Sequence, residues 1–261
     1  MGKSHVLITG ASEGMGREFA RCFARDGHSL VLVARNKTRL DTLAMELNAA
    51  NNIDIRTIST DLSLPAAAEE LKSDLDKQKI VVDILVNNAG VGVYGPFACT
   101  DWKATESMLN LNMIALTHLT RLMLPEMLRR NSGKILNVAS TAAFLPGPFM
   151  ACYFASKAYV LSFTDALAEE LSGTGVTATA FCPGPTRTQF QQRAGTKHIR
   201  ENVFAMDAAP AVEAAYFGLM KNKRLIIPGF VNNLAVLLIR LSPRNLVTRI
   251  TRFLETNRQT L

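Results

Sequence analysis

The chain has few of the residues that mark a disulfide framework or a metal centre. Its 261 residues include four cysteines and four histidines, and neither set has metal-ligand or Cys-x-x-Cys spacing. The sequence shows no apolar signal segment, internal repeat or low-complexity tract. We therefore expect a cytoplasmic protein without a metal ion, whose cysteines act as small buried hydrophobic residues.

Long hydrophobic runs and basic clusters with interleaved aromatic residues are also missing. The net charge is +7, but much of the excess lies in residues 240–261, which hold five arginines and one glutamate. The apolar run at 230–239 is too short to span a bilayer, and it is broken by Asn232 and Asn233. These features argue against a nucleic-acid partner and against a membrane-spanning segment.

Short apolar segments of strand length alternate with amphipathic helical segments along most of the chain. Such alternation is typical of parallel βαβ units in a doubly wound α/β sheet. The seven expected strands are 5–8, 29–34, 53–58, 81–86, 134–139, 176–181 and 224–227. The expected helices are 38–50, a segment opened by Pro65, 103–131 as one helix or a pair, 151–172 and 208–221.

The length of the chain fits one domain followed by a short extension. We expect residues 1–229 to form a Rossmann-type domain whose seven-stranded parallel sheet is flanked by helices. Its polar, irregular stretch 186–207 is interpreted as a mobile flap over the substrate. Residues 230–261 are interpreted as a C-terminal amphipathic helical extension.

Three closely spaced glycines separate the first strand from the first helix. Gly10 would permit the turn, Gly14 would let the backbone approach a phosphate, and Gly16 would let the helix pack on the strand. Such a turn points backbone N–H groups and a helix N-terminus at one spot, which suits a pyrophosphate. The same glycines are compatible with an ordinary strand-to-helix turn.

A tyrosine and a lysine four residues apart form the strongest candidate for acid–base chemistry. Tyr153 and Lys157 share one face of a predicted helix. A nearby ammonium favours the phenolate, so we expect Lys157 to lower the pKa of Tyr153 into a usable range. Ser140 ends a predicted strand, where its hydroxyl could hold a carbonyl oxygen.

Several motifs occur in an order that resembles the short-chain dehydrogenase/reductase family in its single-domain form, over roughly residues 4–229. These motifs are Thr9-Gly10-x-x-x-Gly14-x-Gly16, Asn87-Asn88-Ala89-Gly90, Asn112, Ser140, Tyr153-x-x-x-Lys157 and Pro183-Gly184. The resemblance implies that Tyr153 protonates the carbonyl oxygen and that Ser140 polarises it. It further implies that Lys157 depresses the tyrosine pKa and binds the nicotinamide ribose, and that Asn112 holds a water that relays protons.

The resemblance also implies a set of residues that bind a nicotinamide dinucleotide. They are Gly10, Ser12, Glu13, Gly14, Met15, Gly16, Arg35, Asp61, Leu62, Asn88, Ala89, Gly90, Tyr153, Lys157, Pro183, Gly184, Thr186 and Thr188. Within this set, Asp61 and Leu62 would flank the adenine, and the last four residues would cover the nicotinamide.

The end of the second strand predicts which dinucleotide is used. An acidic residue there would bind the ribose hydroxyls and repel a 2′-phosphate. The chain has Ala34 and Arg35 instead, and an arginine can pair with a phosphate, so NADP(H) is favoured over NAD(H). Glu13 departs from the pattern of NADP-preferring members, which often carry a basic residue there. Lys37 or Arg17 could compensate for it.

The sequence therefore predicts an NADP(H)-dependent oxidoreductase that reduces a ketone or aldehyde to an alcohol. The predicted substrate pocket is mostly apolar and framed by 142–146, 149–150 and the flap, which suits a lipophilic oxoacyl or steroid-like carbonyl. One alternative is an NAD-dependent alcohol dehydrogenase acting oxidatively. Another is a sensor that binds the cofactor without turnover, although such proteins usually lose the tyrosine or the lysine.

The predicted partners are a small-molecule substrate and further copies of the same chain. The resemblance implies a homodimer or homotetramer, paired through the helices at 103–131 and 151–172. After Pro243 the tail has Leu246, Val247, Ile250, Phe253 and Leu254 on one face. Such a basic amphipathic segment could pack on its own domain, pack on a second subunit or make a peripheral membrane contact through 230–256.

Overall fold

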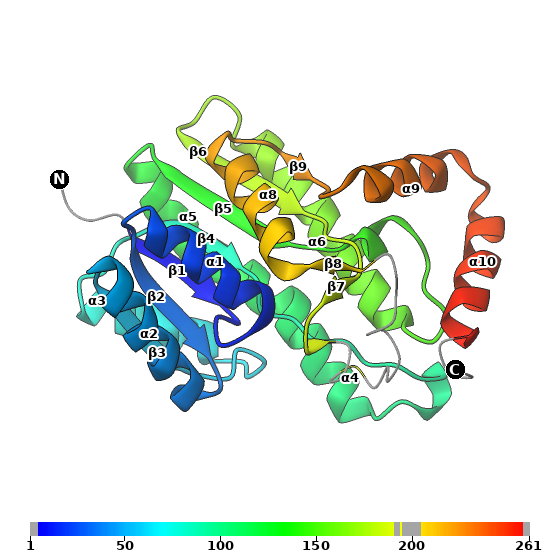
Figure 1. Ribbon diagram of the computed structural model, residues 1–261, viewed down its shortest axis with the longest axis horizontal. Helices are drawn as coiled ribbons and strands as arrows, with labels where there is room; N and C mark the ends of the chain where they lie inside the picture. Colours follow the sequence, from blue (N-terminus) through cyan, green and yellow to red (C-terminus); the bar gives the residue numbers. More distant parts are fainter. Residues whose placement is uncertain (1–4, 191–193, 195–204, 258–261) are drawn as a thin grey trace.

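The computed structural model describes residues 5–190, 194 and 205–257, and its centre is a parallel sheet. The sheet has seven strands in the order β3-β2-β1-β4-β5-β6-β9 (Figure 1). The strands are β1 (His5–Thr9), β2 (Ser29–Ala34), β3 (Ile55–Ser59), β4 (Val82–Asn87), β5 (Gly133–Val138), β6 (Val176–Phe181) and β9 (Leu225–Ile226). The order reverses between β1 and β4, as expected for a doubly wound Rossmann fold, so the predicted fold class is confirmed.

Helices cover both faces of this sheet. The main ones are α1 (Gly14–Arg25), α2 (Lys37–Asn51), α3 (Ala67–Lys77), α4 (Trp102–Leu109), α5 (Leu116–Arg129), α6 (Ala151–Glu170) and α8 (Ala208–Met220). One buried cluster joins α1, α2 and α8 to the sheet, and a second joins α3, α5 and α6 to the other face. Successive residues of β1 point into opposite clusters, Val6 and Ile8 into the first and Leu7 into the second.

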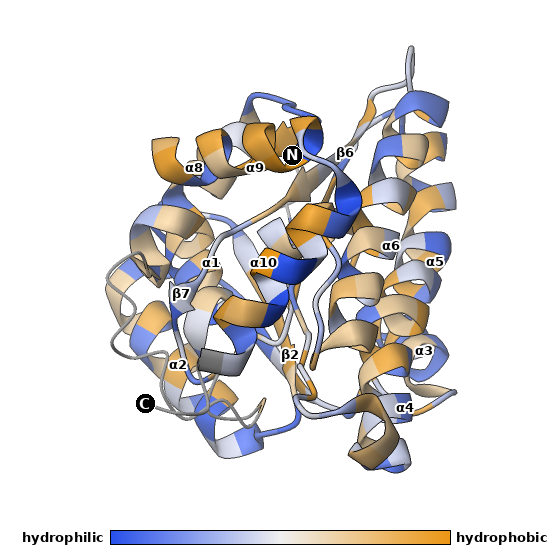
Figure 2. Ribbon diagram, turned by 90° about the vertical axis from the view of Figure 1, so that its right-hand side faces the viewer, coloured by the Kyte–Doolittle hydropathy of each residue, from blue (hydrophilic) through white to orange (hydrophobic). Residues whose placement is uncertain are grey.

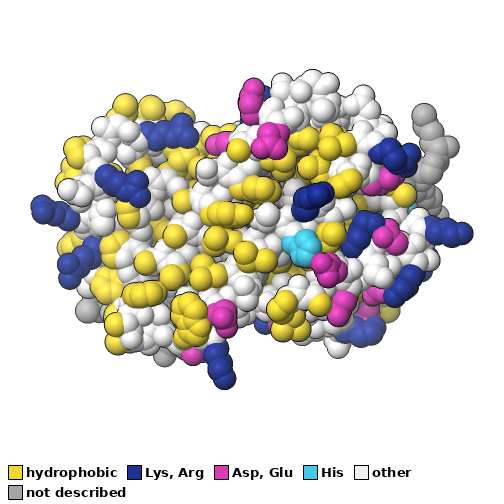
Figure 3. Space-filling model, turned by 180° about the vertical axis from the view of Figure 1, so that it is seen from behind, with side chains coloured by type: hydrophobic (Ala, Val, Ile, Leu, Met, Phe, Trp, Pro, Cys, Tyr) yellow, Lys and Arg dark blue, Asp and Glu magenta, His cyan; other side chains and the backbone are white. Residues whose placement is uncertain are grey.

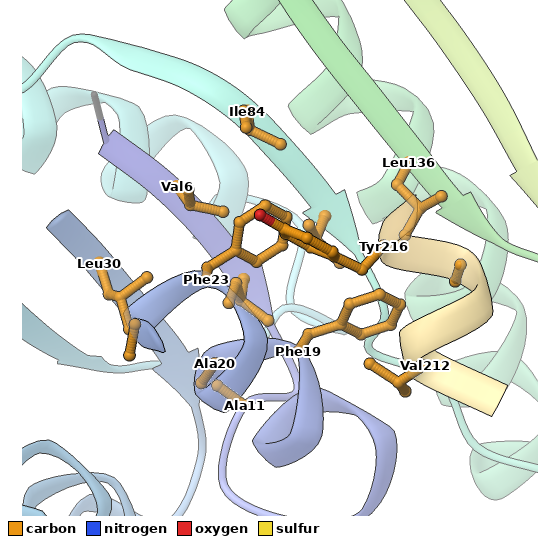
Figure 4. Close-up of a cluster of buried hydrophobic side chains, with 14 of the residues drawn as sticks. Val6, Ala11, Phe19, Ala20, Phe23, Leu30, Ile84, Leu136, Val212 and Tyr216 are labelled. Atoms are coloured by element: carbon orange, nitrogen blue, oxygen red, sulfur yellow. The ribbon is translucent and has the colours of Figure 1, made fainter. Parts of the chain in front are cut away.

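The first cluster is built around aromatic rings from two helices (Figure 4). Phe23 of α1 meets Tyr216 of α8 edge-on, with 5.0 Å between the ring centroids. Phe19 meets Phe181 of β6 in the same manner at 6.1 Å. Edge-to-face rings interlock well in a dense core, which ties the glycine turn before α1 to the rest of the domain.

The expected helix at 103–131 is one continuous element with a wider turn inside it. Between α4 and α5 lies a π-helical segment, η2 (Asn110–Ala115), which the sequence did not predict. Pro125 lies inside α5, near its end. Single π turns within a helix are common at functional sites because they rotate one side chain away from its regular position. Here the segment contains Asn112, one of the predicted catalytic residues.

The cysteines are only partly as expected. All four are free; Cys182 is buried, Cys22 and Cys152 are half-buried, and Cys99 is exposed in the short helix η1 (Phe97–Cys99). The expectation that every cysteine is buried is therefore wrong for Cys99, because η1 has no buried residue.

The chain after β9 forms two further helices, α9 (Phe230–Leu241) and α10 (Arg244–Asn257). They project from the end of the sheet at which β6 and β9 terminate (Figure 1). Within the described ranges, no helix is long and apolar enough to cross a membrane.

The packing of α10 differs from the expected amphipathic pattern. Of its five predicted apolar residues only Val247 is buried, whereas Leu246, Ile250, Phe253 and Leu254 are at least half exposed. The buried side is instead the row Val247, Thr251 and Glu255, four residues apart. The helix packs on its own domain, as one alternative proposed, but with a largely polar face inward. Two of these inward residues, Thr251 and Glu255, line the cavity that contains Tyr153 and Lys157.

Candidate active site

The turn between β1 and α1 requires glycine at each of three positions. Gly10 and Gly14 have φ of +66° and +53°, in the left-handed region. A Cβ on Gly16 would lie 2.2 Å from the carbonyl oxygen of Gly10, so the helix could not pack this closely with a larger residue. A Cβ on Gly14 would meet only the side chain of Thr188 at 3.4 Å, across the cavity.

Thr9 and Asn88 connect the carboxyl ends of β1 and β4. The hydroxyl oxygen of Thr9 accepts hydrogen bonds from the backbone N–H groups of Asn88 and Ala89, each at 3.0 Å. The Nδ2 of Asn88 donates to the carbonyl oxygens of Thr9 at 2.9 Å and Gly10 at 3.3 Å. A Cβ on Gly10 would clash at 2.9 Å with this same amide. The two strand ends are therefore fixed against one another.

A cleft of about 450 Å³ follows this edge of the sheet. The predicted cofactor residues that line it are Gly10, Ser12, Glu13, Gly14, Met15, Arg35, Asp61, Leu62, Asn88, Ala89, Gly90 and Thr188. Gly16 does not line the cleft, because it packs against Gly10 instead. The N-terminus of α1 borders the cleft, and Gly14 there has no side chain that would keep a ligand away from the backbone. Both features fit a pyrophosphate.

A second cavity of about 270 Å³ contains the candidate catalytic residues Ser140, Tyr153 and Lys157. Ser140 follows β5 and caps η3 (Thr141–Phe144), accepting from the N–H of Ala142 at 3.1 Å. Tyr153 and Lys157 lie one turn apart on α6, with the ammonium 5.9 Å from the phenol ring centroid. The remaining predicted cofactor residues, Pro183, Gly184 and Thr186, line the same cavity. Residues common to both cavities, among them Gly90 and Thr188, join the cleft to the pocket.

Burial controls the ionisation of the tyrosine–lysine pair. It raises the pKa of Tyr153 to about 12, and the hydrogen bond with Ser140 lowers that pKa only in part. Burial also lowers the pKa of Lys157 to about 8. The expected depression of the tyrosine pKa by Lys157 is therefore not found in this structure. The ammonium of Lys157 donates instead to the carbonyl oxygen of Val138 at 2.8 Å. The loss of water around a phenolate at Tyr153 raises the pKa of the phenol more than the charge of Lys157 lowers it.

Asn112 lies behind the pocket wall rather than in it. Its Oδ1 accepts from the N–H of Val91 at 3.0 Å, and its Nδ2 donates to the Val91 carbonyl at 3.0 Å and to Ser156 Oγ at 3.1 Å. Gly90, which has no side chain, lies between Asn112 and Lys157 of the pocket. A Cβ there would lie 3.2 Å from Asn112 Oδ1 and 3.4 Å from Lys157 Nζ. The contact with Ser156 was missed by sequence reasoning, since no spacing rule links the two positions.

The charges at the adenosine end of the cleft are arranged differently from the expectation. Glu13 forms an ion pair with Arg39, 2.6 Å from Oε2 to Nη1, and the same guanidinium lies 3.5 Å from Gln189 Oε1. Lys37 and Arg17, the two residues expected to compensate for Glu13, pair with Asp41 and Glu46 instead. Arg39 lies in the first turn of α2, and its proximity to Glu13 depends on how α2 packs. No local pattern shows that packing.

Arg35 projects into the cleft from the end of β2 and remains available to a ligand. Its side chain is 62% exposed, and its Nη1 lies 3.7 Å from Asp61 Oδ2. Burial raises the pKa of Asp61, but hydrogen bonds from Ser63 and the charge of Arg35 leave it below its usual value. In the part of the chain that the structure describes, no three His, Cys, Asp or Glu side chains could hold a metal ion.

The walls of the catalytic pocket were predicted only in part. Ala142, Leu145 and Met150 line it as expected, but Phe144 lies instead beneath the Arg240 guanidinium of α9, 5.0 Å away. Sequence reasoning missed the contribution of α10. Its residues Thr251, Leu254 and Glu255 line the pocket, and Tyr94 donates to the carbonyl oxygen of Glu255 at 3.0 Å. Most of the predicted flap, 191–193 and 195–204, lies outside the described residues.

The family model described as short chain dehydrogenase matches residues 4–198. The chain belongs to this family. It is therefore an oxidoreductase of the carbonyl–alcohol pair that uses a nicotinamide dinucleotide.

Three known proteins illustrate the similarity. The ketoacyl reductase HetN of Nostoc is 34% identical over 224 residues, which cover 84% of this chain and 75% of HetN. The structure of a Sphingobium yanoikuyae short-chain dehydrogenase in complex with NADPH is 36% identical, covers 87% of this chain and 88% of its own, and has a TM-score of 0.82. That of a bulky-bulky ketone specific alcohol dehydrogenase from Comamonas testosteroni is 33% identical, covers 88% of each chain and has a TM-score of 0.79. Other curated relatives are longer, and the chain spans 51% to 60% of two of them.

Proposed function

We propose that the protein is an NADP(H)-dependent reductase of lipophilic ketones or aldehydes. One observation carries the proposal: Ser140, Tyr153 and Lys157 share a pocket that opens into the dinucleotide cleft. A carbonyl group in this pocket would lie beside a neutral phenol and a hydroxyl, the two donors that a reduction needs.

The chain's own residues supply the proton half of the reaction. Ser140 holds the carbonyl oxygen by a hydrogen bond, and the phenol of Tyr153 gives its proton to that oxygen. The bound nicotinamide supplies the hydride that goes to the carbonyl carbon. Lys157 offsets the negative charge left on the phenol oxygen, and its ammonium can return a proton to that oxygen. Asn112, on the other side of Gly90 from Lys157, is proposed to hold the water that relays the replacing proton.

The pKa of Tyr153 fits the proposed reduction. Oxidation of an alcohol requires the phenolate as a base, whereas reduction requires the phenol. With a pKa of about 12, Tyr153 carries its proton at neutral pH. The protonated phenol is the form that the proposed reduction uses. The argument against an NAD-dependent alcohol dehydrogenase acting oxidatively is Arg35 at the cleft, and the complete catalytic set argues against a non-catalytic sensor.

The charges near β2 support a preference for NADP(H). Ala34 leaves space beside the cleft, and Arg35 is exposed enough to pair with a 2′-phosphate. The ion pair with Arg39 offsets the negative charge of Glu13, the feature that favoured NAD. The similar Sphingobium protein was solved with NADPH, which agrees with this choice.

The pocket walls favour an apolar substrate. Leu145, Met150, Phe154, Phe190 and Leu254 surround the catalytic residues. The ketoacyl reductase and the bulky-ketone dehydrogenase among the similar proteins act on substrates of this kind. We propose a bulky or long-chain ketone as substrate, so that the apolar part fills the pocket and displaces its water.

Two or four copies of the chain are proposed to associate through the face of α5 and α6. This face carries hydrophobic side chains in an area with few charges (Figure 3). Exposed hydrophobic residues of this part of the chain include Ile114 of η2, which is 58% exposed, and Leu128 of α5, which is 40% exposed. Burial of such a patch in a twofold contact would stabilise a dimer.

Tyr153→Phe tests the proposed catalytic role. The variant keeps the ring and its packing but lacks the transferable proton, so turnover of a bulky apolar ketone with NADPH should fall by at least about a hundredfold. The affinity for NADPH, followed by fluorescence, should change by less than about threefold. Tyr159→Phe on the same helix is the matched control and should retain activity. Full activity of Tyr153→Phe would refute the assignment.

The buried lysine predicts a pH dependence. Its pKa of about 8 means that Lys157 is charged below that pH and neutral above it, while Tyr153 stays protonated over the whole range. The kcat/KM for ketone reduction should therefore be level at low pH and fall as pH rises through about 8. Residual activity of Lys157→Arg should lack this fall, because arginine keeps its charge. A wild-type profile that rises with pH would contradict the mechanism.

Arg39→Ala tests whether the ion pair sets cofactor preference. Without Arg39, the carboxylate of Glu13 would repel a 2′-phosphate, so the Kd for NADPH should rise several-fold while the Kd for NADH changes little. The double variant Glu13→Gln/Arg39→Ala should recover most of the NADPH affinity. Equal losses for both cofactors, or no recovery in the double variant, would show that the pair has only a structural role.

A further inference from the structure

The two C-terminal helices expose an unusual amount of apolar surface. Of the nineteen large hydrophobic side chains that are exposed in the described part of the chain, ten lie on α9 and α10. They are Phe230, Val231, Leu234, Leu237, Leu238, Leu241, Leu246, Ile250, Phe253 and Leu254. We call this set the α9–α10 surface. In α9 only Val236 is buried, so nearly the whole helix is presented to solvent (Figure 2).

The charges on the same helices are almost all positive. Arg244, Arg249 and Arg252 are exposed, and no ion pair to any of them is found among the described residues. Arg240 is placed differently, because it stacks on Phe144 and fixes α9 to η3. The only acidic residue of the two helices is Glu255, whose side chain faces inward and is 3% exposed. The α9–α10 surface therefore combines exposed leucines and phenylalanines with a local excess of positive charge.

The catalytic pocket opens beside this surface. Leu254 belongs to both, since it lines the pocket and is 54% exposed. The next residue, Glu255, lines the pocket from the buried side of α10, and its carbonyl oxygen is held by Tyr94. A molecule that leaves the α9–α10 surface would thus reach the pocket along one helix.

We propose that the α9–α10 surface binds an anionic lipid bilayer. Amphipathic helices that lie in the interface insert their apolar side chains at the level of the headgroups, and arginines beside them pair with anionic lipids. A bilayer would cover the exposed leucines and match the charge of the exposed arginines. It would also place the pocket mouth at the membrane surface, where lipophilic ketones are concentrated.

A second copy of the chain fits the α9–α10 surface less well. In a twofold contact the same patch meets itself. Arginines of one copy would then approach those of the other, with no exposed acid on these helices to separate them. Like charges at an interface oppose association, whereas an anionic bilayer is complementary to them.

Flotation with lipid vesicles tests this inference. The wild-type protein should float with vesicles that contain about 30% phosphatidylglycerol and bind pure phosphatidylcholine far more weakly, and binding should fall with added salt. Each basic residue near an anionic surface strengthens binding by about fivefold. The triple variant Arg244→Glu/Arg249→Glu/Arg252→Glu should therefore bind at least about a hundredfold more weakly. Leu237→Ser/Leu238→Ser should also lose binding, because it removes inserted apolar area.

Matched controls separate the surface from general charge and hydrophobicity. Arg56→Glu/Lys77→Glu/Lys79→Glu changes the net charge by the same amount at β3 and the end of α3, at the other end of the molecule from α9 and α10 (Figure 1). Met45→Ser/Val81→Ser removes exposed apolar residues elsewhere. Both controls should bind vesicles as the wild type does. Circular dichroism and urea unfolding would establish that each variant is folded.

Three results would overturn the proposal. The first is that the wild-type protein does not float with anionic vesicles. The second is that the controls weaken binding as much as the α9–α10 variants do. The third is that the protein forms a dimer, that leucine-to-serine changes in α9 dissociate this dimer, and that no vesicle binding is seen. A second copy would then cover this surface. Flotation needs no substrate and no turnover, so its failure would leave the proposed reductase activity untouched.

Discussion

The site depends on how the carboxyl ends of β1 and β4 are held together. The buried hydroxyl of Thr9 accepts hydrogen bonds from two backbone N–H groups of the chain after β4. The side-chain amide of Asn88 donates two hydrogen bonds, one to β1 and one to the glycine turn. Buried polar groups that are fully paired in this way define one geometry, since any shift would leave a donor unsatisfied. The dinucleotide cleft lies on this junction, at the point where the strand order reverses.

Further buried hydrogen bonds connect the neighbouring strands to the helix that carries Tyr153 and Lys157. Asn87 of β4 donates to Asn137 of β5 at 2.9 Å, and Asn137 donates to Thr164 of α6 at 2.9 Å. These side chains are fully or almost fully buried. The helix that carries Tyr153 and Lys157 is therefore tied to the same pair of strands as the cleft. A rigid link of this kind keeps Tyr153 and the dinucleotide cleft in fixed relative positions.

The sequence predicted the sheet and the site residues where the signal was local. Apolar segments such as 29–34 and 176–181 mark strands. Gly10 and Gly14 have positive φ, which favours glycine, and a Cβ on Gly10 or Gly16 would clash with the neighbouring backbone. Sequence reasoning failed where the outcome depends on packing between distant segments. The pKa of Tyr153 follows from its burial, which spacing does not reveal. The partner of Glu13 is Arg39 because of how α2 lies on the sheet.

The tail shows the same limit. Its apolar and basic residues were recognised, but the sequence left open whether the apolar stripe of α10 faces its own domain, a second subunit or a membrane. The helix turns Val247, Thr251 and Glu255 toward its own domain, where Thr251 and Glu255 line the pocket, and leaves Phe253 exposed. Leu254 lines the pocket and is still 54% exposed, so hydropathy alone does not mark the inner face of this helix.

The central claim is that the cleft of this fold is built for NADP(H) and serves a reductive reaction. A fluorescence titration of the unmodified protein with NADPH and NADH tests it most directly, because it requires no knowledge of the substrate. The charges at Arg35 and Arg39 predict that NADPH binds at least about tenfold more tightly than NADH. Equal binding, or tighter binding of NADH, would contradict the account.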